Sequence, residues 1–271
     1  MVNSGFVSCV SLFCISSTTS LLVRLAFLVK SPMYCLHFWL PKAHVEAPLL
    51  GSMLLSGVLL KLGGYGFLLL APSQGSCSCL YLILTLLGSV VCSILCFRAW
   101  DFKCVVAYSS VVHIGLVTLG ALTFSELGTS AAIGMLVFHS FISPLLFCLG
   151  NEFYVCSSSR CLISGFASSL SKPILCVFLL LISFNFGLPP TLGFFVEIGT
   201  FVCLGDRSIL FSLLLLCSSF LAFLYNIILY IQGVSGRSGS AKGVVSTFYV
   251  YLPGLFFVVV LPLFSYPSLL F

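Results

Sequence analysis

The chain has 271 residues, of which 60% are hydrophobic and only 6% are charged. A soluble domain carries about 25% charged residues, so this composition excludes a water-soluble protein and indicates one embedded in a lipid bilayer. The formal net charge of +5 is scattered along the chain without a basic run interleaved with aromatic residues, which excludes a nucleic-acid-binding face.

Apolar stretches follow one another along the whole chain, and each is long enough to cross a hydrocarbon core of ~30 Å, which takes about 20 residues. We place spans at about 5–30 running into 33–41, then 50–71, 78–98, 104–122, 130–150, 173–201, 208–232 and 247–265. The polar connectors between them hold no soluble domain. We therefore expect an all-α, polytopic transmembrane helix bundle of about eight spans, forming a single membrane domain over residues 1–271.

Helix breakers interrupt two of these spans. The sequence KSP at 30–32 interrupts the first span, and GLPP at 187–190 interrupts the sixth. Proline removes a backbone hydrogen bond, and the freed groups must be satisfied by a neighbour or by water. One such break alone is explained by an ordinary proline kink, whereas breaks in corresponding helices of two repeats are typical of ion transporters built from inverted repeats. We therefore expect two discontinuous helices.

Ionisable side chains lie within the apolar stretches, where a lysine at the helix centre costs about 2.5–3.5 kcal/mol. Three of them fall near the middle of their spans and two fall beside the breaks; the set is Lys30, Lys61, His113, His139 and Glu197. A single buried histidine is explained by packing with an interhelical hydrogen bond. Five groups at similar depth favour a functional row through the middle of the membrane.

The basic residues of the connectors are unevenly distributed in this topology. Lysine and arginine prefer the side from which the chain is inserted. Only Arg207 falls on one side, and the other side holds Lys42, Arg98, Lys103, Arg160, Lys172, Arg237 and Lys242. The bias supports the topology and places both termini on the outer side; in a mitochondrion the basic side is the matrix.

The 14 cysteines show no Cys-x-x-Cys spacing and lie mostly in apolar stretches, so we expect small apolar residues and no disulfide framework. Only Cys77 and Cys79, two apart in a polar loop, leave a metal or redox role open. The chain contains no dinucleotide-binding glycine motif and no iron–sulfur cysteine spacing. We expect no cofactor and no metal in this chain.

Several ordered motifs resemble those of a known family. They are LHFWLPKAHVEAP at 36–48, VLLKLGGYG at 58–66, DFKCVVAYSSVVHIGL at 101–116, VFHSFISPLLFCLGN at 137–151 and LPPTLGFFVE at 188–197. Together they resemble the antiporter-like, proton-pumping membrane subunits of respiratory complex I, and the KAHVEAP form is similar to the mitochondrial members. The resemblance covers about residues 22–230.

The resemblance implies a role for each residue of the row. Lys30 resembles the family's lysine at the first broken helix, and Lys61 resembles its lysine on the next helix. His113 and His139 resemble the relay histidines, and Glu197 resembles the terminal acidic residue. An amine removed from water gives up its proton more readily, and histidine titrates near neutrality. We expect water to bridge the gaps, because these groups should not touch directly.

The resemblance also implies the setting. The chain would be a multi-pass subunit in the membrane arm of complex I, in the mitochondrial inner membrane, with other membrane-arm subunits as partners. It would couple NADH oxidation by ubiquinone to proton pumping as part of an NADH:ubiquinone reductase, while NADH, FMN, iron–sulfur clusters and ubiquinone are bound by other subunits. Lys42, His44 and Glu46 fit either proton uptake from the matrix or a solvated interfacial cluster.

Two other functions remain open. One is a stand-alone cation/proton antiporter subunit. Lys42 and the GGYG sequence at 63–66 favour the complex I form over this alternative. The other is a non-pumping structural subunit of the membrane arm, against which the retention of every expected charge argues.

The resemblance divides the chain into the end of a first repeat at 1–71, a second repeat at 78–232 and a C-terminal span at 247–265. We therefore expect roughly six further N-terminal spans of ~20 residues each, on a missing segment or a partner chain. Because no carboxylate lies within the first two spans to face Lys30, we expect that segment to supply a glutamate.

Overall fold

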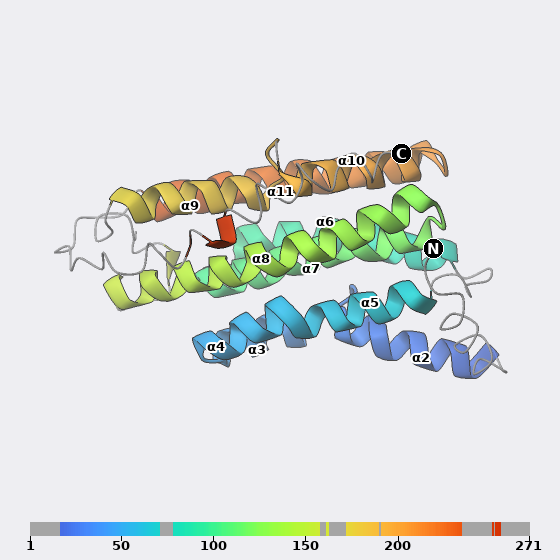
Figure 1. Ribbon diagram of the computed structural model, residues 1–271, viewed down its shortest axis with the longest axis horizontal. Helices are drawn as coiled ribbons and strands as arrows, with labels where there is room; N and C mark the ends of the chain where they lie inside the picture. Colours follow the sequence, from blue (N-terminus) through green and yellow to red (C-terminus); the bar gives the residue numbers. More distant parts are fainter. Residues whose placement is uncertain are drawn as a thin grey trace.

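The structure is a computed structural model that describes residues 17–70, 78–157, 161–162, 172–189, 191–234, 251 and 253–255. Within these residues the secondary structure is helical, apart from an isolated antiparallel bridge between Asp101 and Cys161. The predicted all-α helix bundle is confirmed. Figure 1 shows the helices running side by side along the long axis of the molecule.

The elements follow the chain in the order α2 (Ser17–Lys30), α3 (Trp39–Glu46), α4 (Leu49–Leu54), the π-helix η1 (Leu55–Leu59), α5 (Leu60–Leu70), α6 (Ser78–Arg98), α7 (Phe102–Leu122), α8 (Glu126–Ser157), α9 (Lys172–Asn185), α10 (Leu192–Gly205) and α11 (Ile209–Val234). Five helical stretches are long and apolar enough to cross a membrane: Leu49–Leu70, Cys79–Arg98, Phe102–Leu122, Glu126–Val155 and Ile209–Val234. They match five predicted spans, although α8 extends beyond the predicted 130–150. Residues 5–16 of the first predicted span, and most of 247–265, lie outside the described residues.

Both predicted helix breaks are present. Between α2 and α3 the chain forms turns, and Cys35 adopts a positive φ of 73°. Between α9 and α10 Gly187 adopts a φ of 76°, a left-handed conformation that costs glycine little. Backbone amides at the breaks bond to nearby carbonyls, as Leu188 N does to Ser183 O at 3.1 Å. Each break therefore leaves two short helices in place of one span.

Helix α7 is the centre of the bundle and is almost entirely buried. It packs between α6 and α8, with α3 and α5 also in contact. In Figure 1, α2 to α5 lie along one side of this layer and α9 to α11 along the other. The two halves of each broken helix therefore flank the same central helices, and His113 of α7 is buried among them.

The loops gather at two opposite ends. At one end, Lys103 Nζ donates to Ala47 O at 3.1 Å, and Leu162 N donates to Trp100 O at 2.9 Å. At the other, Arg207 Nη2 donates to Thr123 O at 2.7 Å. Among the described residues, the first end holds the basic residues that the topology places together, Lys42, Arg98, Lys103 and Lys172. Arg160, Arg237 and Lys242 lie outside the described residues.

Candidate functional site

Lys61 and His139 are in direct contact. The Nζ atom of Lys61 on α5 lies 2.6 Å from Nδ1 of His139 on α8, and it also donates to the carbonyl oxygen of Ser56. The expectation that water separates all groups of the row is wrong for this pair. Gly57 of η1 allows this close approach of α8. A Cβ atom at Gly57 would lie only 3.2 Å from Cγ of Pro144 on α8, so the absence of a side chain there brings α8 within reach of Lys61.

The π-helix η1 lies directly before Lys61, at residues 55–59. A π-helix is a wider turn inside an α-helix and is frequent at functional sites. Here it lies where the carbonyl of Ser56 accepts the hydrogen bond of Lys61. This π-helix was not predicted from the sequence; the available signal was the adjacent pair Ser56 and Gly57 in an apolar helix, since such pairs accompany helix irregularities.

His113 continues the row from His139. The two rings are 5.6 Å apart between centroids with an interplanar angle of 46°. His113 is 2% exposed and His139 is 3% exposed, so neither ring meets solvent. The row therefore runs from Lys61 on α5 through His139 on α8 to His113 on α7.

Two asparagines extend the polar network beyond His113. His113 Nε2 lies 3.2 Å from Oδ1 of Asn185 at the end of α9. Asn185 Nδ2 donates to Oδ1 of Asn226 on α11 at 3.0 Å, and Asn226 Nδ2 donates to Ala222 O at 2.8 Å. Both amides are buried. Neither asparagine was predicted as a site residue, because neutral amides do not stand out as ionisable groups do; the available signal was an amide two residues before the break at Gly187.

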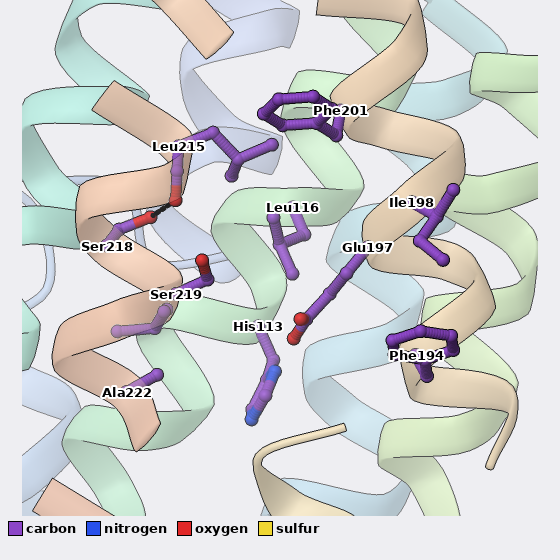
Figure 2. A pocket seen from close by; sticks show the side chains of 11 residues that line it. His113, Leu116, Phe194, Glu197, Ile198, Phe201, Leu215, Ser218, Ser219 and Ala222 are labelled. Atoms are coloured by element: carbon purple, nitrogen blue, oxygen red, sulfur yellow. Dashed lines mark hydrogen bonds between the residues drawn. The ribbon is translucent and has the colours of Figure 1, made fainter. Parts of the chain in front are cut away.

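Glu197 on α10 faces His113 across a cavity of about 180 Å³. The cavity lies between α7, α10 and α11, and Figure 2 shows the end of the Glu197 side chain reaching from α10 toward His113 on α7. A Cβ atom at Gly187 would lie 3.4 Å from the carboxylate, so the second break lies directly beside Glu197. The cavity exceeds the ~10–15 Å³ that one water needs, and the expected water-bridged gap fits here.

Lys30 lies apart from the other four residues. Its side chain is exposed at the end of α2. Its backbone packs against α5, where a Cβ atom at Gly63 would lie 3.0 Å from both the carbonyl carbon and the Cβ atom of Lys30. The first break therefore touches the helix that carries Lys61, while the Lys30 side chain points out of the described bundle.

His44 lies between the row and the basic end. It is fully buried, its ring stacks on Phe147 at 4.5 Å between centroids, and both ring nitrogens lack a hydrogen-bond partner among the described residues. It lies within electrostatic range of Lys61 and Lys103. A polar cavity of about 300 Å³ lies at the basic end, lined in part by Glu46 and Lys103. Lys42 is exposed.

Among the described residues, no group of three or more histidine, cysteine, aspartate or glutamate side chains is arranged to hold a metal ion. Cys79 is a free, exposed thiol, and Cys77 lies outside the described residues. The side chains of the row itself are proton-carrying groups: an amine (Lys61), two imidazoles (His139 and His113) and a carboxylate (Glu197).

Comparisons with known proteins agree with this arrangement. The profile of the family described as "NADH:quinone oxidoreductase/Mrp antiporter, TM" matches residues 8–222. NADH-ubiquinone oxidoreductase chain 4 of Mytilus edulis is 44% identical over 212 residues, which cover 76% of this chain and 49% of the relative. The same subunit of Struthio camelus is 40% identical over 195 residues, covering 70% and 43%. The chain thus spans about half the length of the curated relatives it matches.

Solved structures share the fold. A chain of respiratory complex I from Thermus thermophilus with bound NADH has a TM-score of 0.79 at 24% identity, covering 91% of this chain and 55% of that chain. A chain of the archaeal membrane-bound sulfane sulfur reductase has a TM-score of 0.84 at 18% identity, covering 92% and 53%. A chain of the Mrp complex from Dietzia sp. DQ12-45-1b has a TM-score of 0.74 at 19% identity, covering 83% and 43%. These likenesses confirm the antiporter-like helix bundle.

Proposed function

The chain belongs to the NADH:quinone oxidoreductase/Mrp antiporter transmembrane family, and from that premise we propose that it is a proton-translocating membrane-arm subunit of respiratory complex I. The observation that carries the proposal is the buried row in which Lys61 contacts His139, the His139 ring lies 5.6 Å from the His113 ring, and His113 shares a cavity with Glu197. The names of the relatives support the assignment to complex I.

The row suits proton transfer in short steps. With its ammonium protonated, Lys61 donates to the neutral Nδ1 of His139 at 2.6 Å, a distance at which a proton passes between nitrogens without an intervening group. Two like charges this close repel, so the pair holds one extra proton at a time. A proton on His139 then leaves toward His113, and the cavity between His113 and Glu197 has room for water to carry it on.

Proton uptake is proposed at the basic end. There Glu46 and Lys103 line the polar cavity, and His44, two residues before Glu46 on α3, lies within electrostatic range of both Lys103 and Lys61. Lys30, exposed on α2, would join the row through a carboxylate outside the described residues, because an ammonium in a bilayer needs a partner.

The setting follows from the same proposal. The subunit would lie in the mitochondrial inner membrane among other membrane-arm subunits, as part of an H⁺-translocating NADH:ubiquinone reductase, with NADH, FMN, iron–sulfur clusters and ubiquinone bound elsewhere. Residues 1–71 would end a first repeat and 78–232 would form a second, in keeping with one helix break in each.

A stand-alone cation/proton antiporter subunit is the second candidate, favoured by the likeness to the Mrp complex. Affinity purification from native membranes separates the two functions. Recovery of NADH-oxidising subunits together with this chain supports complex I, and their absence supports the antiporter.

The pumping role is tested with Lys61→Ala and Glu197→Ala. In the assembled complex in proteoliposomes, we expect both variants to oxidise NADH with fewer protons translocated per NADH, because each removes a proton-carrying group from the row. Lys172→Ala is the matched control, since Lys172 is exposed at the start of α9 and outside the row. If both variants assemble and pump at the unmodified ratio, the chain is a structural subunit and the proposal is wrong.

A further inference from the structure

The hydrogen bonds between His113 and the end of the amide chain have a fixed direction. The carbonyl oxygen of Ala222 can only accept, so Asn226 must present its Nδ2 group there, at 2.8 Å. Its Oδ1 atom then faces Asn185, whose Nδ2 donates to it at 3.0 Å. Asn185 is left with Oδ1 toward His113 Nε2, at 3.2 Å. Each amide has one donor and one acceptor end, so the backbone of α11 sets the polarity of the whole chain.

This polarity decides where His113 carries its proton. A neutral imidazole has one N–H and one unprotonated nitrogen, and the acceptor Oδ1 of Asn185 selects the form with the proton on Nε2. Nδ1 is then the unprotonated atom, and it is buried without a hydrogen-bond partner among the described residues. His113 and Glu197 line the same cavity, and Figure 2 shows the Glu197 carboxylate directed toward His113.

We infer that Asn185 and Asn226 are positioning residues, which hold His113 with its proton on Nε2 so that Nδ1 is the atom that takes up and releases the translocated proton. When Nδ1 is protonated, the Asn185 oxygen still accepts from Nε2, so the ring keeps its orientation through the cycle. The break after α9 places Asn185 at the helix end where its side chain reaches both partners. The inference rests on the proposed pumping function and adds the residues that orient its relay histidine.

The test compares two replacements at each asparagine, in the assembled complex in proteoliposomes. Asn185→Asp keeps an oxygen acceptor for His113, and Asn226→Asp keeps an acceptor for Asn185 Nδ2, whereas Asn185→Leu and Asn226→Leu remove these acceptors at similar volume. We expect the two Asp variants to retain protons translocated per NADH oxidised and the two Leu variants to lose them. Ser183→Ala is the matched control, because Ser183 lies on α9 and its hydroxyl donates to Leu180 O, outside the amide chain.

The ranking separates positioning from packing. Burying a carboxylate costs more than burying leucine, so a merely structural role predicts that the Leu variants assemble and pump better than the Asp variants, and that result overturns the inference. Native gels report assembly, and position 226 provides the comparison if Asn185→Leu fails to assemble. Lys61→Ala runs in the same assay: if it pumps normally, the proposed function fails; if it loses pumping while both Leu variants pump normally, only the inference fails.

Discussion

The contact between Lys61 and His139 predicts a large coupling free energy in a double-mutant cycle. His139→Leu leaves a buried ammonium with the Ser56 carbonyl as its remaining partner, which costs about 3–5 kcal/mol of unfolding free energy. Lys61→Met leaves Nδ1 of His139 unpaired, which costs about 1–3 kcal/mol. The double variant has neither orphaned group and should lie within about 1 kcal/mol of the parent. The singles therefore sum to about 4–8 kcal/mol, and we expect a coupling of at least about 3 kcal/mol.

The measurement is the unfolding free energy of the purified subunit in mixed micelles, followed by titration with SDS. Lys172→Met combined with His139→Leu is the control pair, because Lys172 lies at the basic end away from the row, and distant sites add within about 0.5 kcal/mol. A coupling for Lys61 and His139 no larger than that of the control pair would show that the two side chains do not share a hydrogen bond, and the order of the row would have to be redrawn.

The same SDS titration should also measure how glycine substitutions at close contacts change the unfolding free energy. Gly187→Ala forces a positive φ on a residue with a Cβ atom, which costs about 1–2 kcal/mol, and its methyl group would lie 3.4 Å from the Glu197 carboxylate. We therefore expect a lower unfolding free energy and fewer protons translocated. Unchanged values for both would refute the packing at this break. Gly63→Ala would place Cβ 2.7 Å from the Ser31 amide nitrogen, so overpacking of about 1–3 kcal/mol should exceed the helix-propensity gain of about 1 kcal/mol. Gly115→Ala, whose nearest neighbouring atom would be 4.0 Å away, should be neutral or stabilising, and equal effects at the two positions would contradict the predicted contact.

The sequence was informative wherever a residue contradicted its apolar surroundings. The ionisable residues Lys61, His113, His139 and Glu197 stand out because a bilayer penalises them, and the structure brings these four together in the interior. The prolines and glycines marked the two helix breaks because they interrupt the backbone hydrogen bonds of an apolar helix. The position of a residue along its own helix follows directly from the sequence. The residues of the row and the two breaks could therefore be predicted.

Lateral distances were not predictable, because they depend on which helix faces meet. The direct contact of Lys61 with His139 depends on Gly57 packing against Pro144, residues far apart in the chain. Asn185 and Asn226 were overlooked because neutral amides do not stand out in composition, although their mutual hydrogen bond links α9 to α11. The sequence placed Lys30 beside the first break, where α2 ends, but the exposure of its side chain depends on how α2 packs on α5.

The wide turn η1 has a geometric consequence for everything that follows it in its helix. An α-helix advances about 100° per residue, so accommodating one additional residue in a single turn twists α5 by about that angle relative to α4. The direction in which Lys61 leaves the helix axis thus depends on the π-helical backbone of residues 55–59. If that turn tightened to α-helical geometry, the amine would swing away from His139 with every bond in its own side chain unchanged.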